Sequence, residues 1–232
     1  MRLSAGFVLG VVLAAHPGWA SIFGGSKPAG KEQTQLPDII EEGWEYVTHG
    51  SSIKLAHVKS DTRLVLPQVS YGTGSQQQAV TAHGDTASTK NFWVVEKEDE
   101  ADDVLRGTRI ACGAKVRLVN SDSSHNLHSH GNHKSPISGA QEVSGFDGRD
   151  SGDLWTVECL QKDHKAWMRL APVYFKHVET GWYLQSLPSK KYRQPIVGHQ
   201  EVSAAKRPDS NAQWMALEGY YYKEKQGKGE IN

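Results

Sequence analysis

The densest group of residues that could do chemistry in this chain is a run of histidines. The stretch "SSHNLHSHGNHKSP" (123–136) contains His125, His128, His130 and His133. Imidazole binds Zn²⁺ and also exchanges protons near neutral pH. A zinc site requires three or four ligands that converge, and a catalytic imidazole requires a partner that tunes its pKa. The elements that carry these histidines therefore decide which role is open to them.

Few other motifs in the sequence point to catalysis or to a cofactor. Asp147, Asp150 and Asp153 in "DGRDSGD" are three residues apart, unlike the alternate-residue spacing of a calcium loop, so we expect a solvated loop. No G-x-S-x-G, H-E-x-x-H or C-x-x-C motif is present. The formal net charge of zero gives no electrostatic reason to expect nucleic acid as a partner. We predict no catalytic residue, no metal and no cofactor.

The chain from Trp44 onward repeats three times. Each copy has an apolar strand pair, a short Q-x-V block and a tryptophan, and the copies start 63 and then 57 residues apart. The aligned positions are Ile53, Val116 and Val173; Leu64, Leu127 and Leu184; Val80, Val143 and Val202; Trp93, Trp155 and Trp214. The predicted boundaries are about 44–98, 107–161 and 167–219. We call these copies units one, two and three.

Each unit has the pattern of short β-strands joined by tight turns. Apolar residues alternate over short runs, and "KSDTR", "NSDSS" and "ETGW" are typical of hairpin turns. About four strands per unit cannot bury their apolar face alone, so three units must pack together. The sequence therefore predicts an all-β fold, a β-trefoil, with one buried tryptophan per unit and no helix longer than about two turns.

This repeat gives the histidines a place on a strand. Leu127 and Ser129 take the inward positions of unit two, so alternation points His128 and His130 outward. Two strand neighbours and two histidines at the strand ends converge poorly on a metal. The pattern favours a structural or recognition role, with His128 and His130 as a candidate binding surface.

The ends of the chain and its cysteines indicate the secretory pathway. Residues 1–20 combine Arg2, an apolar run and small residues before a cut, as in a cleaved signal peptide. Residues 21–43 are expected to form a flexible arm and 220–232 a polar tail, and no later segment is apolar enough to span a membrane. The two cysteines, Cys112 and Cys159, then predict a single disulfide.

One family shares these residues. "CGAKVRL", "NLHSHGNHKSPISGAQEVSGF" and "GDLWTVEC" (within 112–159) closely resemble the central repeat of the stromal cell-derived factor 2 family. "YGTGSQQQAVT" and "KNFWVV" resemble its first repeat, and "PVYFKHVETGWYLQS" its third. The resemblance covers about residues 44–219. It implies three MIR motifs, which also occur in protein O-mannosyltransferases, inositol trisphosphate receptors and ryanodine receptors.

The resemblance implies a non-catalytic adaptor in protein folding and quality control in the endoplasmic reticulum lumen. Its partners would be a lumenal J-domain co-chaperone with its ATPase chaperone, or unfolded client chains. A lectin-like trefoil that binds O-mannosyl or other glycans is the alternative, with Trp182 and Tyr183 as a stacking platform. The chain ends in "GEIN" rather than a KDEL-type signal. Retention through a partner and secretion both stay open.

Overall fold

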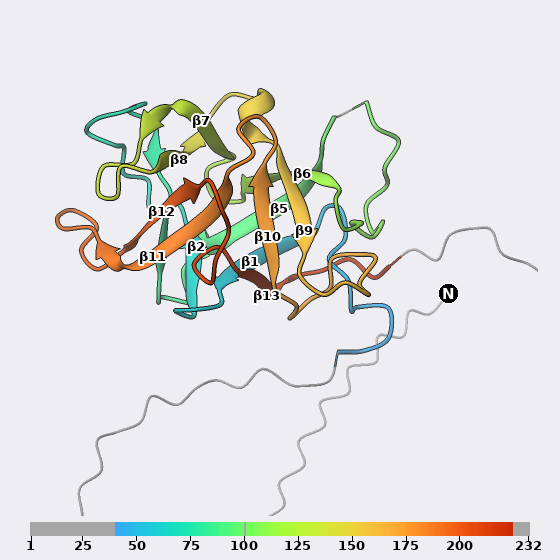
Figure 1. Cartoon of the computed structure of the whole chain (residues 1–232). Coiled ribbons are helices and arrows are strands. Elements are labelled where there is room, and N and C mark those ends of the chain that lie inside the picture. The colour runs from blue at the N-terminus through green and yellow to red at the C-terminus, as the bar shows by residue number, and fades with distance from the viewer. Residues whose placement is uncertain (1–39, 100, 225–232) are drawn as a thin grey trace, which may run out of the picture. The chain divides into compact units, whose positions relative to one another are not determined.

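A computed structural model describes residues 40–99 and 101–224 of the chain. The predicted signal peptide and most of the predicted arm and tail lie outside these residues. Within them the structure forms one sheet of 13 strands and two short 3₁₀ helices, so the expectation of no long helix holds for the described part (Figure 1). None of the helices in this part has the length and apolar character that a bilayer crossing requires.

The elements follow the three units in chain order. Unit one contains β1 (Ser52–His57), β2 (Thr62–Val65), β3 (Gln78–Ala79), β4 (Thr81–His83), η1 (Thr89–Asn91) and β5 (Phe92–Lys97). Unit two contains β6 (Lys115–Asn120), β7 (Asn126–Lys134), β8 (Gln141–Phe146), η2 (Ser151–Asp153) and β9 (Trp155–Cys159). Unit three contains β10 (Val173–His177), β11 (Tyr183–Lys191), β12 (Gln200–Ala205) and β13 (Trp214–Tyr220).

The first and last strands of the units close a barrel. β1 pairs with β5, β5 with β6, β6 with β9, β9 with β10, β10 with β13, and β13 with β1. The middle strands form hairpins, β2 with β4, β7 with β8 and β11 with β12, which pair with one another through β12. A closed barrel capped by three hairpins is a β-trefoil, and closure leaves no free barrel edge. The predicted fold is confirmed.

One tryptophan anchors each unit in the same way. The Trp93, Trp155 and Trp214 side chains are fully buried. Their indole N–H groups donate to the carbonyls of the aligned leucines: Trp93 to Leu64 (3.0 Å), Trp155 to Leu127 (2.8 Å) and Trp214 to Leu184 (3.0 Å). A buried indole N–H needs such a partner. The prediction of three equivalent buried tryptophans is confirmed.

A second repeated contact links each unit to the unit before it around the ring. His57 Nε2 donates to the Asn211 carbonyl (2.9 Å), Asn120 Nδ2 to Lys90 (2.9 Å) and His177 Nε2 to Gly152 (3.0 Å). Each acceptor lies three residues before the anchoring tryptophan of its own unit. Burial lowers the pKa of His57 and of His177, which favours the neutral form of both rings in the folded protein.

The predicted disulfide joins the two ends of unit two. Cys112 precedes β6, and Cys159 ends β9, which pairs with β6 in the barrel. Their Cα atoms are 5.5 Å apart and the sulfurs are bonded, a separation that suits a disulfide. The sequence prediction for Cys112 and Cys159 is confirmed.

Candidate functional site

His128 is buried, contrary to the sequence prediction that it points outward with His130. Its exposed fraction is 2%, and its ring packs against Phe146 at a centroid distance of 4.6 Å. A Cβ built on Gly152 in η2 would meet its ring at 2.6 Å. Alternation correctly separates the two faces of β7, but η2 and β8 cover the second face. The aligned residues Val65 and Gln185 are buried as well.

The reason His128 can be buried is a carboxylate beneath it. Its Nδ1 lies 2.7 Å from Asp153 Oδ1, and Asp153 is fully buried. The other oxygen of Asp153 accepts from Arg117 (2.8 Å) and from the Asp150 backbone N–H (2.8 Å). Buried charges are tolerated when they are paired and hydrogen-bonded. The expectation of a solvated loop is therefore wrong for Asp153.

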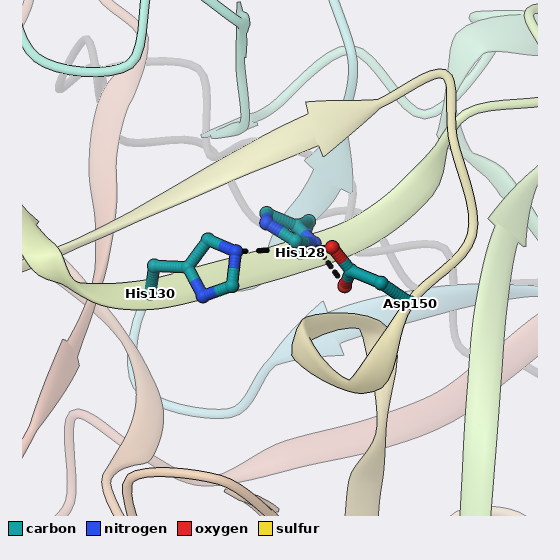
Figure 2. A group of neighbouring side chains, drawn as sticks. All are labelled: His128, His130 and Asp150. Atoms are coloured by element: carbon teal, nitrogen blue, oxygen red, sulfur yellow. Dashed lines mark ion pairs between the residues drawn. The ribbon is translucent and has the colours of Figure 1, made fainter.

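His130 lies at the edge of the same group and is accessible. One third of its side chain is exposed, and its ring meets that of His128 edge-on at 4.4 Å. Its Nε2 is 3.9 Å from Asp150 Oδ2, and its Nδ1 is 3.7 Å from Glu179 Oε2. Figure 2 shows both imidazoles beside the Asp150 carboxylate. We call His128, His130, Asp150, Asp153 and Glu179 the histidine corner.

Trp182 and Tyr183 lie in the neighbouring unit, next to Glu179 in sequence. Glu179 and Trp182 belong to the turn between β10 and β11, and Tyr183 starts β11. Both aromatic rings are partly buried. Trp182 packs against the core, and Lys206 Nζ lies 5.5 Å from the centroid of its ring. The ring centroids of Tyr183 and Tyr174 are 5.9 Å apart. The structure thus brings His130 next to their turn but gives the aromatic rings their own partners.

His125 and His133 do not join the histidine corner. The His125 ring bonds the Ser123 carbonyl in the turn before β7. β7 extends to Lys134, so His133 lies within the strand rather than at its end, where the pairing with β8 shifts register between Ser129 and Lys134. Of the four histidines in the stretch 123–136, two contribute to one cluster.

The three acids of the corner were not predicted from the sequence. Asp150 and Asp153 form a capping box around η2, in which each side chain bonds the backbone of the other end. The available signal was a D-x-x-D motif that ends two residues before the anchoring tryptophan. Asp153 also aligns with the buried residues Asn91 and Ala212, two residues before Trp93 and Trp214. Glu179 had no such signal, because it reaches His130 only across two units.

Comparison with curated proteins identifies relatives of this chain. It is 42% identical over 185 residues to the stromal cell-derived factor 2-like protein of Dictyostelium discoideum, covering 77% of this chain and 85% of that one. It is 38% identical to stromal cell-derived factor 2 of Homo sapiens, covering 76% and 82%. The chain belongs to the stromal cell-derived factor 2 family. No protein-family model matches it.

Solved structures agree with this membership of the stromal cell-derived factor 2 family. The SDF2-like protein from Arabidopsis thaliana superposes with a TM-score of 0.74 at 35% identity and covers 78% of this chain and 99% of its own. A protein O-mannosyltransferase complex of S. cerevisiae bound to its sugar donor matches with a TM-score of 0.67 at 26% identity. That match covers 77% of this chain but 26% of the transferase chain.

Proposed function

We propose that this protein is a non-catalytic adaptor of chaperone-assisted folding in the endoplasmic reticulum lumen. The observation that carries the proposal is coverage: the aligned region accounts for 82–85% of two relatives named as factors rather than enzymes. In the mannosyltransferase the same fold makes up about a quarter of the chain. The aligned region is thus most of these two relatives and a small part of the enzyme that it resembles.

The proposal includes the parts of the chain outside the described residues. Residues 1–20 act as a cleaved signal peptide, which delivers the trefoil to an oxidising lumen. The Cys112–Cys159 disulfide is consistent with such a compartment. The partner is a lumenal J-domain co-chaperone with its ATPase chaperone, as the family resemblance implies, and the partner retains the protein in the lumen.

The partner-binding face that we propose combines the exposed edge of the histidine corner with the neighbouring turn. His130, Trp182 and Tyr183 belong to it, since each keeps part of its side chain accessible. His128 contributes from below by packing edge-on against the His130 ring. The aligned residues in other units differ: Pro67 and Leu187 replace His130. A face that breaks the threefold pattern gives a partner one position to recognise.

The experiment is a binding titration of the mature chain with a purified lumenal J-domain co-chaperone. The double variant His130→Ala/Tyr183→Ala should bind at least tenfold more weakly, because central aromatic and polar anchors carry much of an interface's affinity. The matched control is Leu187→Ala, at the position of unit three that aligns with His130. Equal affinity of the double variant and the wild type would refute the proposed face, and no binding by the wild type would refute the partner.

Glycan binding is the second candidate, supported by the likeness to the mannosyltransferase trefoil. An aromatic ring at the surface can stack on a sugar, and Trp182 is the partly exposed indole of the proposed face. This function is tested by titrating the protein with O-mannosyl peptides while tryptophan fluorescence is monitored. Saturable quenching that Trp182→Ala abolishes would support it, whereas an unchanged spectrum would exclude it.

A further inference from the structure

We propose that the histidine corner binds one divalent transition-metal ion of the Zn²⁺ class through His128, His130 and Asp150. One ring nitrogen of each histidine and one oxygen of Asp150 lie within 4.8 Å of one another (Figure 2). His128 and His130 come from β7, and Asp150 caps η2, so the site joins two elements of unit two. No metal was predicted from the sequence, because two strand neighbours and two histidines at the strand ends were expected to converge poorly on an ion.

The spacing requires only a small closure. In a tetrahedral zinc site the ligand atoms lie about 2.0–2.2 Å from the ion and hence about 3.3 Å from one another. His130 Nε2 and Asp150 Oδ2 are now 3.9 Å apart, and His128 would bind through Nε2, because Asp153 occupies its Nδ1. The His130 and Asp150 side chains are 33% and 42% exposed. Both therefore have room to turn toward an ion.

Each imidazole already has a second carboxylate of the kind that orients metal-binding histidines. Asp153 Oδ1 holds His128 Nδ1 at 2.7 Å, and Glu179 Oε2 faces His130 Nδ1 at 3.7 Å. A carboxylate on one ring nitrogen fixes the tautomer and leaves the other nitrogen's lone pair for a metal. In the described structure the buried His128 Nε2 has no hydrogen-bond partner. A bound ion would explain why an imidazole with a spare nitrogen is buried here.

The donor types favour one class of ion, and the sequence restricts the site to one unit. Imidazole nitrogens favour Zn²⁺, Co²⁺, Ni²⁺ and Cu²⁺ over Ca²⁺ and Mg²⁺, which prefer oxygen ligands. Three protein ligands at an exposed edge leave a fourth position for water. The aligned residues Val65 and Pro67 of unit one, and Gln185 and Leu187 of unit three, include no imidazole. The site is therefore specific to unit two.

Calorimetric titration of the disulfide-bonded mature chain with Zn²⁺ alone tests the inference, with Co²⁺ as a spectroscopic probe. We expect one ion per chain and Co²⁺ absorption bands of a nitrogen–oxygen tetrahedral site. His130→Ala and Asp150→Asn should each weaken binding at least tenfold, and Glu179→Gln by roughly tenfold, as loss of an orienting carboxylate does. These side chains are partly exposed, so the variants avoid the folding defect expected for His128.

Two matched controls separate this site from nonspecific histidine binding. His133→Ala removes a histidine of the same strand outside the cluster. His83→Ala removes one member of the stacked His83–His199 pair, whose centroids are 4.2 Å apart. Both controls should leave affinity unchanged. Absence of stoichiometric Zn²⁺ uptake by the wild type, or unchanged affinity in both His130→Ala and Asp150→Asn, would overturn the site. The readout is independent of the proposed partner.

Discussion

Each unit repeats one anchor, a tryptophan indole bonded to a leucine carbonyl, and we call these three anchors the frame. In unit two, the frame and the histidine corner use neighbouring residues of the same strand, β7. The Leu127 carbonyl accepts the Trp155 indole, and Leu64 and Leu184 do the same for Trp93 and Trp214. One residue further along β7, His128 contacts Asp153, whereas the aligned residues are Val65 and Gln185. The leucine and tryptophan positions of these anchors have the same residue types in all three units, whereas the buried position after the leucine differs between units. Departure from the repeat, rather than burial, marks the candidate site.

Truncating an anchoring tryptophan should have the largest effect on stability. Trp155→Ala removes a fully buried side chain and leaves the Leu127 carbonyl without its donor. The expected loss is about 3–5 kcal/mol of unfolding free energy. Urea unfolding of Trp93→Ala, Trp155→Ala and Trp214→Ala should give similar losses. A loss in one unit far below the other two would break the equivalence of the units.

Removing the disulfide tests how much this bond, which only unit two has, adds to the stability that the shared frame provides. Cys112 and Cys159 close a loop with a sequence separation of 47, and a bond of this kind typically contributes about 2–4 kcal/mol by restricting the unfolded chain. The double variant Cys112→Ala/Cys159→Ala should unfold at correspondingly lower urea concentration. Reduced wild-type protein is the control and should match the variant. An unchanged midpoint would mean that the frame alone sets stability.

Neutralising Asp153 tests the corner itself. Asp153→Asn introduces the residue that unit one has at the aligned position, Asn91, and removes the charge that faces Arg117 and His128. Hydrogen bonds to charged groups contribute about 1.5–3 kcal/mol each, so a loss of that size is expected. The reverse exchange, Asn91→Asp, buries a carboxylate in unit one and should also destabilise. If neither variant unfolds at a lower temperature than the wild type, the two positions are interchangeable.

The smallest expected effect is on pH dependence. The folded-state pKa values of His57 and His177 lie below 6.5 because of burial, so the unfolded chain takes up protons first on acidification. Their stabilising contribution is complete above about pH 6.5 and is lost as pH falls from there through the lower folded-state pKa values. Asn120 makes the same contact in unit two without titrating.

The double variant His57→Asn/His177→Asn therefore copies unit two. Its unfolding free energy should fall less between pH 7.5 and pH 5 than that of the wild type, as measured by urea unfolding at both values. Some slope should persist, since burial and the neighbouring His83 lower the pKa of His199 to about 4. An identical slope in both proteins would contradict the assigned role of the two histidines.

The frame could be predicted from the sequence because its signals are local and repeated. Aligned tryptophans and alternating apolar residues were enough to indicate the trefoil and its anchors, and the two cysteines, which are not repeated, indicated the disulfide. The burial of His128 could not be predicted in the same way, because alternation says which residues share a face and not what covers it. Its cover comes from η2 and Phe146, and Glu179 arrives from unit three. Contacts between segments that the repeat does not relate require the folded structure.

We propose that partner recognition belongs to the histidine corner, which breaks the repeat, and not to the three tryptophan anchors. Amide chemical-shift mapping of the isotopically labelled mature chain, titrated with an unlabelled lumenal J-domain co-chaperone, tests it most directly. We expect the largest shifts to cluster at 128–131, 150 and 179–183, while the aligned residues 65–68 and 185–188 stay unchanged. Shifts of equal size at the aligned positions of all three units, or confined to another face, would contradict it.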